Sequence, residues 1–353
     1  ATDAEISKRL VIEINTRLKF MLDVGLNYLS LNRISYTLSG GEIQRIHLTR
    51  SLGSNLTSSL YVLDEPSIGL HPRDTDKLIK VLKVLRDLGN TVVVVEHEED
   101  IIASADYLID IGPKAGIHGG NVVFAGPYED IHSDAADCLT AKYMSGRMEI
   151  PVPKQRRSWT ESIVIKGARQ HNLKDITVTF PLNVFIAVSG VSGSGKTTLI
   201  KQILYPLLMH RMGEGQDKPG THDSIEGDLK SIKKIEMVSQ QPIGKSSRSN
   251  PVTYVKAYDA IRKLYSKQQA AKIKGFKPKH FSFNVEAGRC EVCKGAGETV
   301  VSMQFLADVR LECDECGGMR FQKDVLQVRY KGKNIYETLA MTVDEAIAFF
   351  EEN

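Results

Sequence analysis

Apolar residues recur along the chain at spacings that predict alternating helices and strands. Up to residue 35 they follow helical spacing, and a turn at Leu38 leads into a second helix that reaches residue 50. Short apolar runs at 59–63 and 91–95 are expected to be buried parallel strands, separated by an amphipathic helix over 73–89. A strand, helix, strand order of this kind implies a right-handed crossover, so the sequence predicts an α/β fold.

A second structural region is expected after residues 147–160, which contain Pro151 and Pro153, lose hydrophobic periodicity and are interpreted as a linker. Before this linker, the glycines of 118–127 predict a hairpin. After it, apolar patterns predict strands at 163–165, 176–180, 185–188, 235–238 and 325–330. Helices are expected at about 253–266 and from Thr342 onwards.

The strand expected at 185–188 leads into a glycine-rich loop that begins at Gly190 and fits G-x-x-x-x-G-K-[ST]. Between a strand and a helix, this motif binds nucleoside triphosphates, because its backbone N–H groups converge on phosphate oxygens. Lys196 would reach the β and γ phosphates, and the Thr197 hydroxyl would hold Mg²⁺. The residues expected to bind ATP here are Gly190, Ser192, Gly193, Ser194, Gly195, Lys196, Thr197 and Thr198.

The strand at 59–63 ends in two acids of the kind that a phosphate-loop ATPase needs on a second strand. Asp64 would bind Mg²⁺, and Glu65 would polarise the attacking water. Within one nucleotide-binding domain the phosphate loop precedes this strand, but here the strand comes first. We therefore expect the pieces of two units, one without its beginning and one without its end, in a central fragment of a longer tandem ATPase.

The sequence Leu38-Ser39-Gly40-Gly41-Glu42 matches the signature of ABC-type ATPases. In that class two units pack head to tail, and the signature of one closes on nucleotide held by the phosphate loop of the other. A serine hydroxyl and glycine N–H groups at a helix start suit an anion, so Ser39, Gly40 and Gly41 are expected to contact ATP.

Two further residues occupy positions at which ABC-type ATPases act on nucleotide. His97, after the strand at 91–95, corresponds to a histidine that contacts the γ-phosphate, and Gln240, after the strand at 235–238, to a glutamine that senses Mg²⁺ and water. A lone histidine is more often structural. The order of all these motifs together predicts an α/β, P-loop ABC-type ATPase containing parts of two tandem nucleotide-binding domains.

Four of the five cysteines form two C-x-x-C pairs separated by 19 residues, which is a zinc-binding pattern. Four thiolates leave no open position for water, so Cys290, Cys293, Cys313 and Cys316 predict a structural Zn²⁺ module inserted at 286–320. Cys138 stands alone and is interpreted as a small apolar residue.

Composition and charge exclude some classes of protein. Hydrophobic residues make up 42% and charged residues 25%, and the net charge of +3 excludes a strongly polycationic protein without excluding a local basic groove. Neither a membrane-spanning apolar run nor a signal peptide is visible, so we expect a cytoplasmic protein without a membrane partner. Lys245, Arg248 and Arg289 could contact DNA phosphates, although a solvated surface explains them equally well.

An ABC-type ATPase with a zinc module after its phosphate loop resembles the UvrA family, the damage-recognising subunits of bacterial nucleotide excision repair. The strings that carry the resemblance include Leu63-Asp64-Glu65-Pro66-Ser67-Ile68-Gly69-Leu70-His71, Val95-Glu96-His97, Arg248-Ser249-Asn250-Pro251 and Gly288-Arg289-Cys290. The resemblance implies a dimer that uses ATP, binds damaged double-stranded DNA and hands the lesion to UvrB.

The resemblance also implies a domain plan. Residues 1–146 would end the first nucleotide-binding domain, 161–250 would begin the second, and 251–353 would form its helical signature region with the zinc module. No second pair of acids follows Lys196, so nucleotide binding with little or no hydrolysis is expected. Two alternatives stay open: an ABC-type subunit of a transporter, which the zinc module disfavours, and a catalytically inert DNA-binding module.

Overall fold

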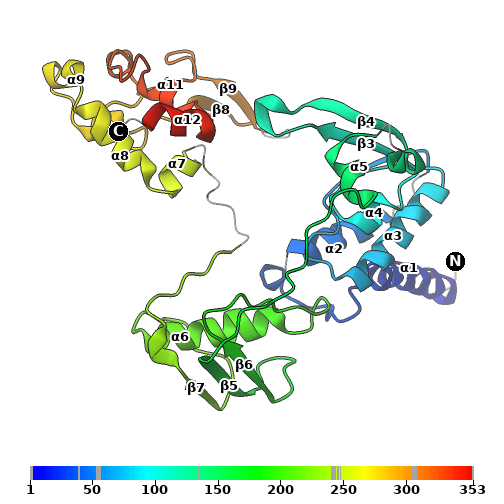
Figure 1. Ribbon diagram of the computed structural model, residues 1–353. Coiled ribbons are helices and arrows are strands. Elements are labelled where there is room, and N and C mark those ends of the chain that lie inside the picture. The colour runs from blue at the N-terminus through cyan, green and yellow to red at the C-terminus, as the bar shows by residue number, and fades with distance from the viewer. Residues whose placement is uncertain are drawn as a thin grey trace. The chain divides into compact units, whose positions relative to one another are not determined.

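The computed structural model describes residues 3–38, 40–52, 57–133, 136–239, 244, 246, 248–303 and 308–351. The chain divides into two compact units, Ala1–Met237 and Val238–Asn353 (Figure 1). Short 3₁₀ turns lie at Ser35–Thr37, Gly116–His118, Tyr128–His132, Leu229–Ser231 and Pro278–Phe281. Among the described residues, none of the helices is both long and apolar enough to cross a bilayer.

The first unit begins with α1 (Asp3–Asp23) and α2 (Gly40–Leu52). The expectation of a helix to residue 35 is wrong, because α1 stops at a Schellman turn. Gly25 adopts a left-handed φ of 77°, and the Leu26 N–H donates back to the Met21 carbonyl at 2.9 Å. The turn places Val24 and Leu26 in the hydrophobic core.

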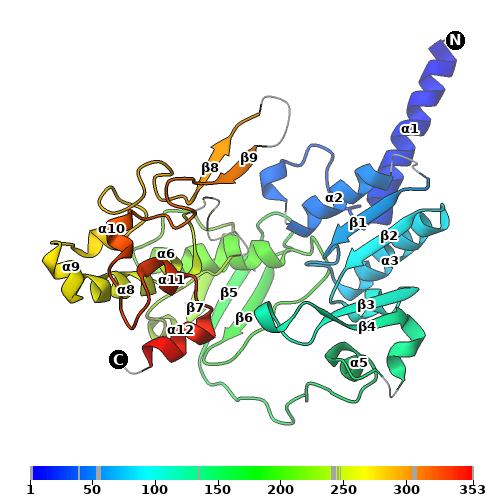
Figure 2. The same ribbon diagram turned by 90° about the horizontal axis from the view of Figure 1, so that it is seen from above.

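Strands β1 (Leu60–Asp64) and β2 (Thr91–Val95) are parallel neighbours, with Asp64 opposite Val95 (Figure 2). The connection between them is α3 (Pro72–Asp87), as the sequence predicts, and it is followed by α4 (Glu99–Ile102) after β2. We call the cluster beneath this sheet the first core; its buried members are Val24, Leu26, Leu48, Leu78, Val81, Leu82, Leu85 and Ile101.

A hairpin follows, but it is displaced from the expected position. Its strands are β3 (Tyr107–Gly112) and β4 (Asn121–Pro127), so residues 118–127 supply mainly the second strand. The helix α5 (Leu139–Met144) comes next, and the Cys138 sulfur accepts the Ala141 N–H at 3.4 Å at its start. Cys138 is buried in a small cluster with Ile131 and Ala141, which fits its interpretation as an apolar residue.

The rest of this unit is built on an antiparallel sheet of order β6-β5-β7, from β5 (Ser162–Ala168), β6 (Ile176–Pro181) and β7 (Ser224–Gly227). A π-helical segment, Thr198–Leu204, continues directly into α6 (Tyr205–Arg211). We call the cluster that these elements bury the second core; its buried members are Ile163, Ile165, Ala168, Phe180, Leu199, Ile203, Leu208 and Leu229.

Two strands expected in this region are absent from the described residues. Residues 185–188 and 235–238 have no strand pairing, and Phe185 and Val238 are 97% and 89% exposed. The apolar runs are real, but neither has a neighbouring strand to bond with here. The prediction of strands at both places is wrong.

The second unit contains α7 (Pro251–Tyr254), α8 (Ala257–Ser266), α9 (Gln269–Ile273), β8 (Glu298–Val301), β9 (Val309–Glu312), α10 (Lys323–Leu326), α11 (Ile335–Leu339) and α12 (Val343–Phe350). The helix expected over 253–266 is interrupted at Lys256, whose φ is 61°. The strand expected at 325–330 is wrong, because its first residues belong to α10. The helix expected after Thr342 is α12, and the Thr342 hydroxyl caps it.

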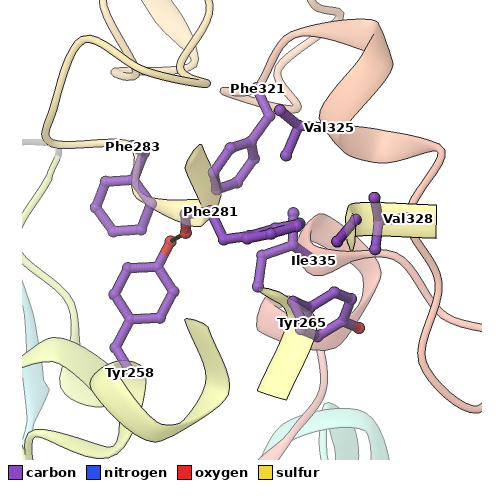
Figure 3. Packing of buried hydrophobic residues seen from close by; sticks show 9 residues of the cluster. Tyr258, Tyr265, Phe281, Phe283, Phe321, Val325, Val328 and Ile335 are labelled. Carbon is purple, nitrogen blue, oxygen red and sulfur yellow. Dashed lines mark hydrogen bonds between the residues drawn. The ribbon is translucent and has the colours of Figure 1, made fainter. Parts of the chain in front are cut away.

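An aromatic core holds the second unit together (Figure 3). Phe281, Phe283 and Tyr265 have no solvent exposure, and the Tyr258 hydroxyl donates to the Phe281 carbonyl at 2.6 Å. Burial raises the pKa of Tyr265 to about 12, so its hydroxyl stays protonated at neutral pH. That hydroxyl donates to the Lys333 carbonyl at 2.8 Å, which ties α8 to the turn before α11.

Candidate functional site: a phosphate loop, an acidic strand end and a four-cysteine cluster

The glycine-rich loop of residues 190–197 closes around the ammonium group of Lys196. The Nζ atom donates to the carbonyls of Gly190 at 2.6 Å and Val191 at 2.9 Å. Helical hydrogen bonding begins at the end of the loop, where the Leu199 N–H donates to the Gly195 carbonyl at 2.9 Å. The loop therefore leads into a helix start and holds a lysine ammonium group among its carbonyls, a combination suited to a phosphate site.

Two glycines in the loop are required by their surroundings. Gly195 has a φ of 106°, and a Cβ there would lie 2.8 Å from the Leu173 Cδ2 atom. Gly193 has a φ of 74°. Its carbonyl accepts the Asn172 side-chain amide at 2.9 Å, so a residue before β6 helps to fix the loop. Asn172 lies outside all of the sequence motifs.

The acids expected to act on Mg²⁺ and water lie at the carboxyl end of β1. The Glu65 N–H donates to the Val95 carbonyl at 2.9 Å, and Glu65 has a left-handed φ of 45°, which is uncommon for a residue with a side chain. The His97 Nε2 atom lies 3.5 Å from a Glu65 carboxylate oxygen, and both side chains are open to solvent. Asp64, Glu65 and His97 are thus brought together at one edge of the β1–β2 sheet.

A neighbouring carboxylate, Glu96, joins two loops at this edge. One oxygen accepts the Ser67 N–H at 2.8 Å, and the other accepts the Ser67 hydroxyl at 2.9 Å and the His97 N–H at 3.0 Å. The Glu98 N–H also donates to it, at 3.4 Å. Glu96 appeared in the sequence analysis only as part of a string, because nothing in its spacing indicates these contacts.

The helix that carries the signature sequence is attached to the same edge. The Gln44 side-chain amide donates to the Asp64 carbonyl at 2.6 Å. A Cβ on Gly41 would lie 2.5 Å from the Ile68 carbonyl oxygen, so only glycine fits there. The helix α2 starts at Gly40, while Ser39, Gln240 and Lys245 lie outside the described residues.

The phosphate loop and the two acids belong to different parts of the first unit. Asp64 and Glu65 follow β1, whose partly buried residues pack on the first core. Lys196 precedes the segment that buries Leu199 and Ile203 in the second core. The chain thus carries the acids and the phosphate loop on segments that pack into separate cores.

The four expected zinc ligands form one buried cluster in the second unit. Their sulfur atoms all lie within 4.8 Å of one another, with Cys290 and Cys313 3.9 Å apart and Cys293 and Cys316 3.7 Å apart. A tetrahedral Zn²⁺ with bonds of about 2.3 Å requires sulfurs about 3.8 Å apart. The donor set and its spacing therefore fit a structural zinc ion.

Backbone amides support this cluster from outside. The Gly297 N–H donates to the Cys293 sulfur at 3.3 Å, and the Arg320 N–H donates to the Cys316 sulfur at 3.4 Å. Burial raises the pKa of the Cys293 thiol, but hydrogen bonds with the Gly297 and Gly295 N–H groups and with Cys316 and Cys290 together lower it to about 7. Burial raises the pKa of Cys290 and Cys316. Metal binding would therefore release protons from these thiols.

Arg289 and Arg248 are the two described residues that were expected at a DNA surface. They differ in how accessible their side chains are. Arg289 is held by Glu286, with an Nη2 to Oε1 distance of 2.7 Å, and only 12% of its side chain is exposed. Arg248 lines an open pocket of about 360 Å³ together with Asn250 and Tyr254. Of these two, Arg248 is the better placed to meet a phosphate.

The class of protein follows from comparison with solved structures. No protein-family model matches the chain. The crystal structure of UvrA2 from Deinococcus radiodurans superimposes with a TM-score of 0.89 at 40% identity, covering 98% of this chain and 41% of that one. The chain thus has the α/β fold of an ABC-type ATPase with a four-cysteine module.

Curated relatives give the family. The chain is 53% identical over 349 residues to UvrABC system protein A from Aquifex aeolicus and 50% identical over 349 residues to that from Halalkalibacterium halodurans. These alignments cover 99% of this chain, but only 38% and 36% of the two relatives. The chain belongs to the UvrA family and spans little more than a third of the length of these curated relatives.

Proposed function

We propose that the chain takes part in ATP-dependent recognition of damaged duplex DNA in nucleotide excision repair. The observation that carries this proposal is its identity of 50% or more, over 99% of its length, to proteins named UvrABC system protein A. The naming of these relatives also supports UvrB as the protein that receives the lesion. Assembly as a homodimer and a cytoplasmic location are part of the same proposal.

The first element of the proposal is an ATP and Mg²⁺ site around Lys196. The loop N–H groups would bind phosphate oxygens, and the lysine would exchange its contacts with the Gly190 and Val191 carbonyls for the β and γ phosphates. The Thr197 hydroxyl would hold Mg²⁺. The signature glycines Gly40 and Gly41 would close on nucleotide in the head-to-tail arrangement of this class.

The second element is the edge formed by Asp64, Glu65 and His97. Asp64 would bind Mg²⁺, Glu65 would polarise water and His97 would contact the γ-phosphate. Because these residues follow strands that pack on the first core, whereas Lys196 precedes a helical segment that packs on the second core, they would serve different nucleotides. We therefore expect this chain to bind ATP and to hydrolyse it slowly or not at all.

Replacing Lys196 tests the nucleotide site. Lys196→Ala is expected to weaken binding of Mg²⁺ and a non-hydrolysable ATP analogue roughly 10- to 100-fold, because a charge-assisted bond to phosphate is lost. Titration calorimetry measures the change. Lys201→Ala, at an exposed position on the helical segment that follows, is the matched control and should bind as the unchanged chain does.

Two results would contradict this part of the proposal. If Lys196→Ala binds the ATP analogue as tightly as the unchanged chain does, the proposed nucleotide site at Lys196 is wrong. Steady ATP turnover by the chain, abolished by Lys196→Ala, would overturn the separation of the two sets of residues.

The third element is DNA binding by the second unit. Arg248→Ala is expected to weaken binding to duplex DNA carrying one bulky adduct and to reduce the slope of log affinity against log salt by about 1, because one phosphate contact is lost. Fluorescence anisotropy over a series of salt concentrations measures both quantities. Arg156→Ala, in the exposed segment 147–160, removes the same charge elsewhere and serves as the control.

The outcomes separate the proposal from its alternatives. Salt-dependent DNA affinity without ATP binding would favour the inert DNA-binding module. Identical affinity and slope for Arg248→Ala and the unchanged chain would exclude Arg248 from the DNA surface.

A further inference from the structure

A tyrosine from the loop between α1 and α2 lies directly against the phosphate loop. A Cβ placed on Gly193 would come within 2.5, 2.6 and 2.9 Å of three ring carbons of Tyr28. These distances are shorter than any contact that real Cβ atoms make, so the ring covers the position where a side chain would start. Tyr28 belongs to none of the motifs that identify the nucleotide site.

Tyr28 is held firmly from its own side of the contact. Leu26, two residues earlier, is buried in the first core with 1% exposure. The Tyr28 hydroxyl donates to a Glu42 carboxylate oxygen at 2.6 Å, and Glu42 lies in the first turn of α2. Burial, followed by the bond to Glu42, raises the pKa of Tyr28, so the hydroxyl remains a donor at neutral pH.

Gly193 is also held from its other side. Its carbonyl accepts the Asn172 side-chain amide at 2.9 Å, and the next residue, Ser194, donates its N–H to the Val191 carbonyl at 3.2 Å. Gly193 is therefore restrained on one side by the Tyr28 ring and on the other by the Asn172 side-chain amide. Restraint of this kind lowers the entropy that a loop loses when its N–H groups converge on a phosphate group.

We propose that Tyr28 is a positioning residue for the triphosphate of the nucleotide bound at Lys196, acting through its ring contact with Gly193. This inference rests on the proposed nucleotide site. It adds that a residue two positions after Leu26 of the first core sets the shape of a loop attached to the second core. The same ring is bonded to α2, so the start of the signature helix and the phosphate loop are held by one side chain.

The experiment compares Tyr28→Ala, Tyr28→Phe and Tyr143→Ala in the same chain. Tyr143 is a second exposed tyrosine of the first unit, on α5, so its variant removes an equal ring elsewhere. The affinity for Mg²⁺ with a non-hydrolysable ATP analogue is measured by titration. Circular dichroism of each ligand-free variant reports whether it is folded.

Tyr28→Ala is expected to bind about five- to tenfold more weakly, because the loop loses one of its two restraints. Tyr28→Phe keeps the ring but not its bond to Glu42, so it should retain most of the affinity and weaken binding about two- to threefold. Tyr143→Ala should match the unchanged chain. Recovery of affinity by phenylalanine distinguishes a positioning role from a general loss of stability.

Failure of this inference is distinguishable from failure of the proposed site. If the unchanged chain binds the analogue and Lys196→Ala does not, but Tyr28→Ala and Tyr28→Phe both bind as well as the unchanged chain or more tightly, Tyr28 has no positioning role. If Tyr28→Ala does not fold, Tyr28→Leu, which keeps apolar bulk but not the ring, takes its place: affinity equal to that of the unchanged chain overturns the inference. If the unchanged chain binds no nucleotide, the proposed site itself fails.

Discussion

Removal of zinc is expected to unfold the module of residues 290–316 and to do so before the rest of the second unit. Within the described part of this module, the buried cluster consists of the four cysteines, with Ala296 packed against them. Every residue of β9 is exposed. Because the module buries so little apolar surface of its own, bonds to a metal ion would take the place of a hydrophobic core. Structural zinc contributes roughly 10–16 kcal/mol in zinc-finger peptides, which is comparable with the whole unfolding free energy of a typical domain, about 5–15 kcal/mol.

Two measurements check this expectation. A chelator or the Cys313→Ser variant should remove about one equivalent of zinc per chain, and hydrogen exchange of the amides near Gly297 and Arg320 should become fast. Cys138→Ser is the matched control, since serine also caps a helix and this sulfur lies in another cluster. Slow exchange in the metal-free protein, with unchanged amide protection across 290–316, would contradict a zinc-dependent module.

Phe281→Ala is expected to destabilise the second unit by about 3–5 kcal/mol. Phe281 has no solvent exposure, and its ring lies 5.6 Å from that of Tyr265 and 6.2 Å from that of Phe276, measured between centroids. Figure 3 shows it in the middle of the cluster, between the side chains of α8 and those around α10 and α11. Truncation leaves a cavity that these rings cannot fill without moving, so lost contacts add to lost burial.

Hydrogen exchange under native conditions measures the effect on each unit separately. In Phe281→Ala, the free energy of exchange of the α8 amides should fall by about 3–5 kcal/mol. The protection of the α3 amides in the first unit should not change. Tyr254→Ala is the control for removing an aromatic ring, because Tyr254 is 64% exposed. A loss below 1 kcal/mol in α8 for Phe281→Ala would show that the cluster is not the core of this unit.

The features that sequence predicts best are those with local causes. The two C-x-x-C pairs were predicted correctly to form one cluster. Each pair is a short turn that presents two sulfurs, so a four-sulfur site needs only one further pair. The helix α3 follows from its apolar stripe, with Leu78, Leu82 and Leu85 buried on one side. Parallel pairing of β1 and β2 follows from the crossover that α3 makes between them.

The failures concern strands, because a strand needs a partner that local sequence does not show. The apolar run at 185–188 resembles a buried strand, yet Phe185 is almost fully exposed. In residues 325–330, the buried side chains are Val325 and Val328, three residues apart, which is helical spacing rather than alternation. Apolar content alone favoured a strand there.

In the candidate site, only residues that belong to recognisable motifs could be predicted from the sequence. The spacing of motifs picks out Lys196, Glu65 and the cysteines as candidates for their proposed chemistry. Tyr28, Glu96 and Asn172 act through contacts made by the folded chain, since their partners lie 29 residues away for the Glu96–Ser67 bond and 21 for the Asn172–Gly193 bond. No periodicity in the sequence points to such pairs.

The carboxylate of Glu96 couples the two loops that follow β1 and β2. It accepts hydrogen bonds from the loop after β1, through Ser67, and from the loop after β2, through His97 and Glu98. A movement of either loop that pulls Ser67 or His97 away must break bonds to the same two oxygen atoms. A substitution that displaces one loop would therefore also disturb the other, through their common bonds to Glu96.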